Sequence, residues 1–138
     1  MADPSRYVVR LGDVDTLAFP WGTLHFTCSP LVNGANRLSA GIVVMKPGEG
    51  HGRHNHPGTE EIIQVLSGSG KQMVEDEHGN PVLHDVEQGC TIFVPKGRFH
   101  STANTGASEM VVFVVYSPAG PEQMLRSLPD CKILPAAP

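Results

Sequence analysis

Two histidines and a nearby carboxylate are the residues of this chain best suited to chemistry. They are His54, His56 and Glu61, in a glycine-rich stretch that runs into an apolar segment. Alternate side chains of an extended segment share a face, so His54 and His56 point the same way. Two imidazoles and one carboxylate that converge provide nitrogen and oxygen ligands for a metal ion. A fourth ligand must come from elsewhere in the chain, or that position stays open for water and substrate.

The segment after the histidines predicts a strand that presents Glu61 on one face. By alternation Glu61 falls on the same face as Ile63 and Val65, and Glu60 falls on the opposite, solvated face. Glu61 is therefore predicted to ligate the metal. The alternative is an unbound carboxylate that acts as the catalytic acid or base beside a metal held by three histidines.

A third histidine follows a second strand-and-turn pattern. The apolar run 91–94 ends at Pro95-x-Gly97, and His100 comes three residues later. A single histidine after a turn is more often a surface residue than a ligand. His100 becomes a candidate ligand only when it is considered together with His54, His56 and Glu61.

The two clusters together closely resemble the two sequence motifs of the cupin family. The first motif is filled by Gly48, His54, His56, Glu61 and Gly68, and the second by Gly89, Pro95, Gly97, His100 and Asn104. The resemblance covers roughly residues 38–116. It implies an all-β fold, a small antiparallel jelly-roll barrel also described as a double-stranded β-helix. It also implies metal ligands at His54, His56, Glu61 and His100.

This donor set indicates the kind of metal. Three imidazoles and a carboxylate suit one divalent transition metal ion (Fe, Mn, Ni, Co, Cu or Zn), whereas Ca and Mg prefer mostly oxygen ligands.

The remaining histidines are predicted to have no role in the site: His25, His78 and His84. His51 lies an odd number of residues from His54 and is predicted to face away, with a place at the rim of the site as the alternative.

Length and turn content favour a single, turn-rich domain. The chain has 138 residues with 15 Gly and 12 Pro, which is typical of many short strands in a sandwich or barrel. A single cupin domain over 1–138 is predicted. Its parts are an N-terminal arm at 1–37, a barrel core at about 38–116, and a C-terminal helix and tail at 117–138.

The expected elements follow from alternation and turn residues. Strands are predicted at 7–11, 23–27, 38–46, 62–66, 71–75, 82–84, 91–94 and 110–116, and one short helix at 121–128. The strand 110–116 is apolar throughout and is predicted to be buried on both faces. A common core is predicted for Ile42, Val44, Ile63, Val65, Phe93, Phe113 and Val115.

Charge and cysteine content exclude several classes of partner. The net charge is −4 and no basic run is present, so nucleic acid is not expected as a partner. The longest apolar window is far shorter than the ~20 residues of a membrane helix, and Met1–Ser5 shows no signal peptide. Three cysteines without CxxC spacing are predicted to be reduced thiols of a cytoplasmic protein: Cys28, Cys90 and Cys131.

Three functions are compatible with these residues. The first is a metal-dependent enzyme for an oxygen-rich organic substrate (enol, diketone or polyphenol), with dioxygenase chemistry expected and Glu61 taking a proton if it detaches. The second is a redox-neutral isomerase, lyase or polyketide-type cyclase that stabilises an enolate. The third is a non-catalytic barrel that binds or senses a small molecule. A homodimer is predicted, with residues 7–11 as the exchanged edge strand.

Overall fold

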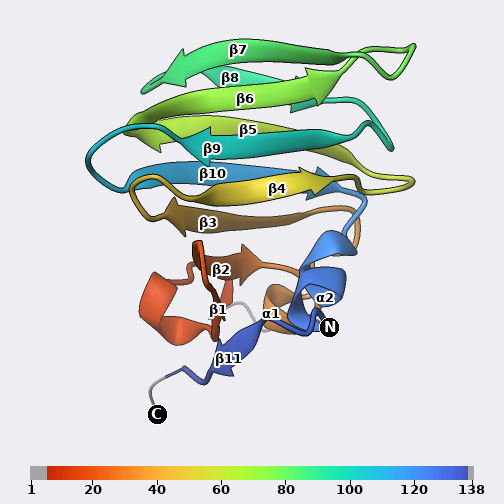
Figure 1. Cartoon of the computed structure of the whole chain (residues 1–138). Helices are drawn as coiled ribbons and strands as arrows, with labels where there is room; N and C mark the ends of the chain where they lie inside the picture. The colour runs from red at the N-terminus through yellow and green to blue at the C-terminus, as the bar shows by residue number, and fades with distance from the viewer. Residues whose placement is uncertain (1–5, 137–138) are drawn as a thin grey trace.

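The computed structural model describes residues 6–136 as two antiparallel sheets that face each other (Figure 1). The larger sheet contains, in spatial order, β11 (Lys132–Leu134), β1 (Thr16–Phe19), β2 (Gly22–Cys28), β3 (Ser39–Met45), β10 (Met110–Ser117), β5 (Glu60–Ser67) and β8 (Thr91–Val94). The smaller sheet contains β4 (Gly50–His54), β9 (His100–Asn104), β6 (Ser69–Glu75) and β7 (Pro81–Glu87). The predicted all-β antiparallel fold is confirmed. Residues 1–5, which include the segment assessed for a signal peptide, and residues 137–138 lie outside the described part.

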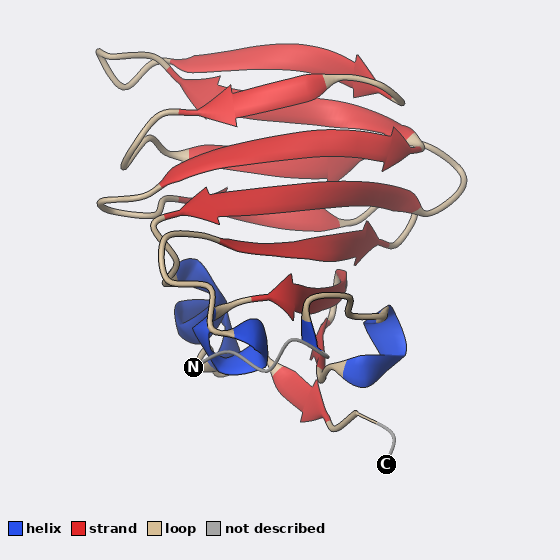
Figure 2. Ribbon diagram, turned by 180° about the vertical axis from the view of Figure 1, so that it is seen from behind, coloured by secondary structure: helices blue, strands red, loops and turns tan. Residues whose placement is uncertain are grey.

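The helical segments are short and lie at one end of the sandwich (Figures 1 and 2). They are a 3-10 helix (Leu11–Asp13), α1 (Pro30–Asn33) and α2 (Pro121–Arg126). Helix α2 begins with proline, whose fixed φ suits the first helical position. The predicted C-terminal helix is therefore present, and it ends two residues before the expected Leu128.

The core lies between the two sheets and is made by alternation along the central strands. In β10 the side chains of Met110, Val112 and Val114 point inward and are almost fully buried. On the neighbouring β5, Ile63 and Val65 do the same. A strand with one covered face needs only every second residue to be apolar.

The predicted edge strand at residues 7–11 is wrong. Tyr7 and Val8 are exposed and unpaired with any strand, and a 3-10 helix begins at Leu11. The reason is local: the backbone N–H of Arg10 donates to the Asp13 carboxylate at 2.9 Å, and the N–H of Asp13 donates to the Arg10 carbonyl at 3.0 Å. This reciprocal cap closes a turn where an extended strand was expected.

Most of the predicted core is also placed wrongly. Of its seven residues only Ile63 and Val65 are buried, and the rest lie on the outer face of the larger sheet. Strand β10 is likewise buried on one face only, since Phe113 is 36% exposed. The cause is the architecture. In a two-layer sandwich each sheet covers only the inner face of its partner, and no described part of the chain covers the outer face of the larger sheet.

Candidate metal centre

The strand register brings the two histidine motifs together. Strands β4 and β9 are antiparallel neighbours, and His54 pairs directly with His100. Glu61 enters from β5 of the opposite sheet, and His56 lies just beyond the end of β4. One donor atom from each of these four residues lies within 4.8 Å of the others. Donors bound at 2.0–2.2 Å to one ion are separated by roughly 3–4 Å, so the predicted ligands converge on a space close to that of a metal site.

Two of the imidazoles are oriented by backbone carbonyls. His54 Nδ1 donates to the Gly52 carbonyl at 2.6 Å, and His100 Nδ1 donates to the Arg98 carbonyl at 2.9 Å. A carbonyl oxygen only accepts, so the proton sits on Nδ1 and the Nε2 lone pair is free in both rings. Hydrogen bonds of this kind fix the tautomer that a metal-binding histidine needs.

Several buried polar atoms of the site have no hydrogen-bond partner. They are both ring nitrogens of His56, Nε2 of His100 and Oε1 of Glu61. His100 Nε2 lies 3.0 Å and His56 Nε2 lies 3.5 Å from Glu61 Oε1. Unsatisfied buried polar groups are costly, and a divalent cation among them would satisfy the inward-facing lone pairs. The donor set therefore fits one divalent transition metal ion.

Burial controls the protonation of these groups. It lowers the pKa of His54 to about 2 and the pKa of His56 to about 4, with repulsion from neighbouring imidazoles adding to the effect. Both rings are thus neutral near pH 7, the form that binds metal. Burial raises the pKa of the Glu61 carboxyl, opposed by the His100 ring. A cation beside it would favour the ionised form.

His51 lies at the rim of the site, where alternation alone predicted that it would face away. Its ring stacks on His54 with centroids 3.7 Å apart, and Trp21 stacks on its other side at 4.8 Å. The register of β4 against β9 is irregular between His51 and His54. Side chains therefore do not alternate strictly there, and the prediction that His51 faces away does not hold. Trp21 was not singled out from the sequence, and no spacing signal connected it with the histidines.

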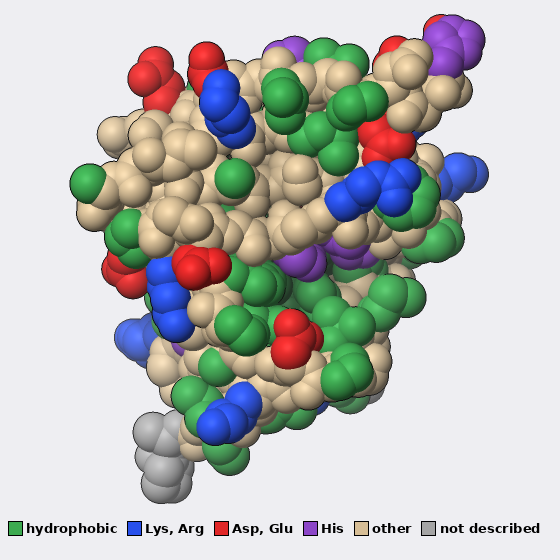
Figure 3. Space-filling model, in the orientation of Figure 1, with side chains coloured by type: hydrophobic (Ala, Val, Ile, Leu, Met, Phe, Trp, Pro, Cys, Tyr) green, Lys and Arg blue, Asp and Glu red, His purple; other side chains and the backbone are tan. Residues whose placement is uncertain are grey.

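The space inside the histidine cluster is small. It measures about 20 Å³, close to the volume that one water needs. Tyr116 lines this space, and its ring contacts His56 edge-on at 5.0 Å. Burial raises the pKa of Tyr116 well above its usual value, so its phenol stays protonated. Figure 3 shows histidine side chains reaching the surface between the two sheets, bordered by apolar side chains.

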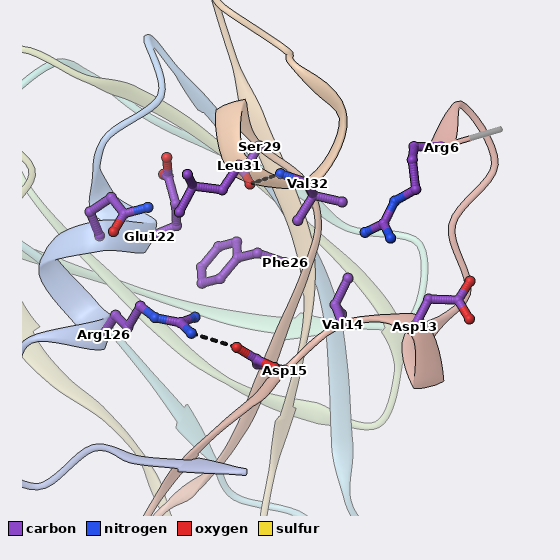
Figure 4. Close-up of a pocket in the computed structure, with 11 residues that line it drawn as sticks. Arg6, Asp13, Val14, Asp15, Phe26, Ser29, Leu31, Val32, Glu122 and Arg126 are labelled. Atoms are coloured by element: carbon purple, nitrogen blue, oxygen red, sulfur yellow. Dashed lines mark hydrogen bonds and ion pairs between the residues drawn. The ribbon is translucent and has the colours of Figure 1, made fainter. Parts of the chain in front are cut away.

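Three larger pockets lie away from these donors. One, of about 220 Å³, sits beside α1 and α2 (Figure 4), and its charged groups are mostly paired: Arg126 with Asp15, and Glu122 with the Ser39 hydroxyl at 2.7 Å. Another is a cleft of about 530 Å³ lined mainly by β6, β7 and β8. The third, of about 380 Å³, lies beside the turn at Cys90. None of the three is lined by any of the four donor residues.

The sequence matches the family model described as "Cupin domain" over residues 41–116. The chain is a member of the cupin family. Curated relatives include Protein SchB of Streptomyces halstedii, 27% identical over 88% of this chain and 84% of that protein. Polyketide synthase CurC of Streptomyces cyaneus is 29% identical over 86% of this chain and 73% of that protein.

Solved structures show the same fold. A structure of Bacillus subtilis oxalate decarboxylase, determined in a study of its Mn(II) centres, superposes with a TM-score of 0.73 at 22% identity, covering 87% of this chain and 33% of that chain. Recombinant oxalate oxidase with glycolate gives 0.67 at 23% identity, covering 72% of this chain and 52% of that chain. The chain thus spans about a third to a half of these solved chains. Among residues 6–136, no helix is long and apolar enough to cross a membrane.

Proposed function

We propose that this cupin is a metal-dependent enzyme whose ligands are His54, His56, His100 and Glu61, and whose substrate is a small oxygen-rich compound of the enol, diketone or polyphenol type. One observation carries the proposal: three imidazoles and a carboxylate converge, and buried polar atoms of His56, His100 and Glu61 lack hydrogen-bond partners. A structural metal is usually closed by four ligands in a tetrahedron. A metal that accepts five or six ligands would keep positions for two substrate oxygens.

Within this class we propose redox-neutral enolate chemistry of the polyketide-cyclase type. The support is the similarity to polyketide synthase CurC, which extends over 73% of that protein. When bound, a divalent ion would supply Lewis acidity to a chelated dicarbonyl. Dioxygenase cleavage, the first expectation from sequence, needs the same donors and a redox-active metal. The likeness to oxalate oxidase, at 23% identity, supports only the fold.

The chain's own residues would perform three tasks in this reaction. His54 and His56, whose pKa values burial lowers, stay neutral near pH 7 and can hold a lone pair toward the site. Glu61, in a dry environment that raises its pKa, either ligates or takes the proton removed from the substrate carbon. The protonated Tyr116 phenol lines the pocket and can donate a hydrogen bond to a developing enolate oxygen.

The test combines metal identification with an oxygen measurement. Natively purified protein should contain about one divalent transition metal per chain, and it should enolise or cyclise a β-polyketone model compound without consuming O₂. Substrate-dependent oxygen uptake would contradict the cyclase proposal and favour the dioxygenase. Retained binding of the same compound by metal-free protein, with no turnover in either form, would make the barrel a binding module.

We also propose a homodimer in a reducing, cytoplasmic environment. The cysteines support the second part, because Cys28, Cys90 and Cys131 are all unpaired. The structure does not support a dimer through an exchanged edge strand at residues 7–11, since those residues form no strand. We therefore propose that the pairing surface lies elsewhere on the chain.

A further inference from the structure

We infer that the cleft of about 530 Å³ between strands β7 and β8 binds the carbon skeleton of the substrate, a neutral and largely apolar ring system whose oxygens reach toward the histidine cluster. This inference rests on the proposed function and names the place where most of the substrate molecule lies. We call this space the edge cleft. The residues that line it and carry the argument are Gln72, Val74, Val82, Asp85, Ile92 and Phe93.

The edge cleft is an opening between the two sheets. Strand β7 is the last strand of the smaller sheet and β8 is the last strand of the larger one, so in the described part of the chain no backbone ladder joins the sheets on this side. Both strands lie at the same end of the molecule (Figure 1). The two lips carry exposed apolar side chains, since Val82 on β7 is 40% exposed and Phe93 on β8 is 55% exposed. A concave opening with apolar lips is typical of a ligand site.

The size of the edge cleft suits a molecule of several rings. Its floor belongs to the interior, because Val86 is buried and Val74 and Ile92 pack against the hydrophobic core. Its volume of about 530 Å³ falls within the range of roughly 300–1,000 Å³ of pockets that bind small organic molecules. The space inside the histidine cluster, about 20 Å³, takes only a group the size of a water. A substrate with a carbon skeleton must therefore place that skeleton outside the cluster.

Two residue pairs across β6 and β9 connect the edge cleft with the candidate metal centre. Val74 lines the cleft and is the register partner of the donor residue His100. Gln72 also lines the cleft, and its side-chain oxygen accepts a hydrogen bond of 2.6 Å from the hydroxyl of Thr102, a residue that lines the space inside the cluster. Neighbouring strands are about 4.8 Å apart. A ring system in the cleft therefore lies one strand away from the metal donors.

The lining of the edge cleft indicates an uncharged ligand. Among the described residues that line it there is no Lys, Arg or Glu, and its one carboxylate, Asp85, accepts a hydrogen bond from Lys71 Nζ at 2.7 Å. An anionic ligand would therefore find no free cation in the cleft, and burying an unpaired charge is costly. A neutral ring system would instead gain from covering apolar side chains such as Val74, Val82 and Ile92. An aromatic or partly cyclised polyketone with its oxygens along one edge has this chemistry.

Filling the edge cleft tests the inference. The probe is 1,8-dihydroxyanthraquinone, a planar molecule with oxygens along one edge, and its dissociation constant is measured by calorimetry on metal-loaded and metal-free protein. Wild-type protein should bind the probe in both forms, and more tightly with metal. Val82→Trp adds a large ring at the lip and should raise the dissociation constant about 10-fold or more in both forms. The matched control is Leu83→Trp, the next residue of β7, which is 65% exposed and does not line the cleft, and it should bind the probe normally.

A second variant keeps the test independent of how Val82→Trp folds. Phe93→Ala shortens the apolar lip on edge strand β8, where the side chain is 55% exposed, so the variant should fold and bind the probe more weakly in both forms. Metal content per chain should stay at the wild-type level in both lip variants, because neither residue is a donor.

The outcomes distinguish this inference from the proposed function. Unchanged binding in the folded lip variants, or an equal loss in Leu83→Trp, would overturn the edge cleft as the binding site. Loss of binding in Trp21→Ala alone would do the same, because it would place the ring system at the rim beside His51. Equal affinity with and without metal would show that the oxygens do not reach the cluster, which also overturns the inference. Natively purified protein without metal would contradict the proposed function, whereas probe binding by the cleft would persist.

Discussion

The two faces of the larger sheet differ in what they lack. On the inner face, Glu61 and the histidines that face it from the smaller sheet present buried polar atoms without hydrogen-bond partners. On the outer face, one residue along the same strand, Ile62 belongs to an apolar surface without a cover. The same alternation along β5 produces both conditions. An ion can satisfy the polar atoms of the inner face, whereas the apolar side chains of the outer face offer it no ligand.

The two faces of one strand therefore present two separate chemical environments. Residues on opposite faces of a sheet do not touch, so changes to one face should leave the other almost unaffected, as is usual for sites without shared partners. The comparison fails if a change on one side disturbs both metal content and oligomeric state in folded protein.

The largest effect is expected from removing a ligand. His100→Ala leaves Glu61 and His56 in place but deletes a donor that lies 3.0 Å from the carboxylate. Divalent-metal affinity should fall at least 100-fold, measured by calorimetry and by metal analysis of purified protein. His84→Ala, an exposed histidine on β7, is the control and should bind metal normally. Normal metal affinity in folded His100→Ala would contradict the proposed centre.

The convergence of the four candidate ligands could be predicted from residue spacing together with the family motif. Alternation places His54 and His56 together, and the family motif adds His100 and Glu61, wherever the strands lie in space. The faces of the sheet could not be predicted in the same way. Alternation indicates that Phe113 and Ile42 share a face, but whether that face is covered depends on how many layers the chain builds. For His51 the alternative from sequence, a place at the rim, is the one that the structure shows, because the register of β4 is irregular.

Acid should destabilise the metal-free protein through the inner face. Burial lowers the pKa of His51 to about 4, that of His54 to about 2 and that of His56 to about 4. In the unfolded chain the histidine pKa values are about 6.5, so near pH 5 the unfolded chain binds more protons than the folded chain. The free energy of unfolding therefore rises with pH in this range, and stability is lost as pH falls below about 6.5. Glu61 has the opposite effect on the pH dependence, because its raised pKa makes the folded chain hold a proton that the unfolded chain releases, but it is one group against three.

The measurement is thermal unfolding of metal-free protein across pH. The melting temperature should fall by about 5–10 °C between pH 7 and pH 5. The triple variant of these histidines to glutamine should lose most of this dependence. A flat profile in the wild type, or an unchanged slope in a folded triple variant, would show that the imidazoles are not held neutral by burial.

A matched pair of valines tests whether burial really differs between the faces. Val112 points inward and is 1% exposed, whereas Val115 points outward and is half-buried. Val112→Ala should lower the free energy of unfolding by about 2 kcal/mol through lost burial and a residual cavity. Val115→Ala should cost less than about 1 kcal/mol at concentrations where the protein is monomeric, measured by urea denaturation. Equal costs would mean that the outer face is packed within a single chain.

The smallest effect is expected at the rim of the centre. His51 is not one of the four donor residues, but its ring stacks on the flat side of His54 and on the Trp21 ring. His51→Ala removes that support, so the His54 ring gains freedom that metal binding must then restrict. Metal affinity should fall about 10-fold, roughly 1.4 kcal/mol.

The conservative variant distinguishes stacking from ligation in this last case. His51→Phe keeps a flat ring beside His54 but has no nitrogen, so it should restore most of the wild-type affinity if His51 only positions its neighbour. If His51→Phe binds metal as weakly as His51→Ala while both remain folded, His51 takes part through its nitrogens. The inner face would then contain a fifth protein ligand, and fewer positions would be open to substrate.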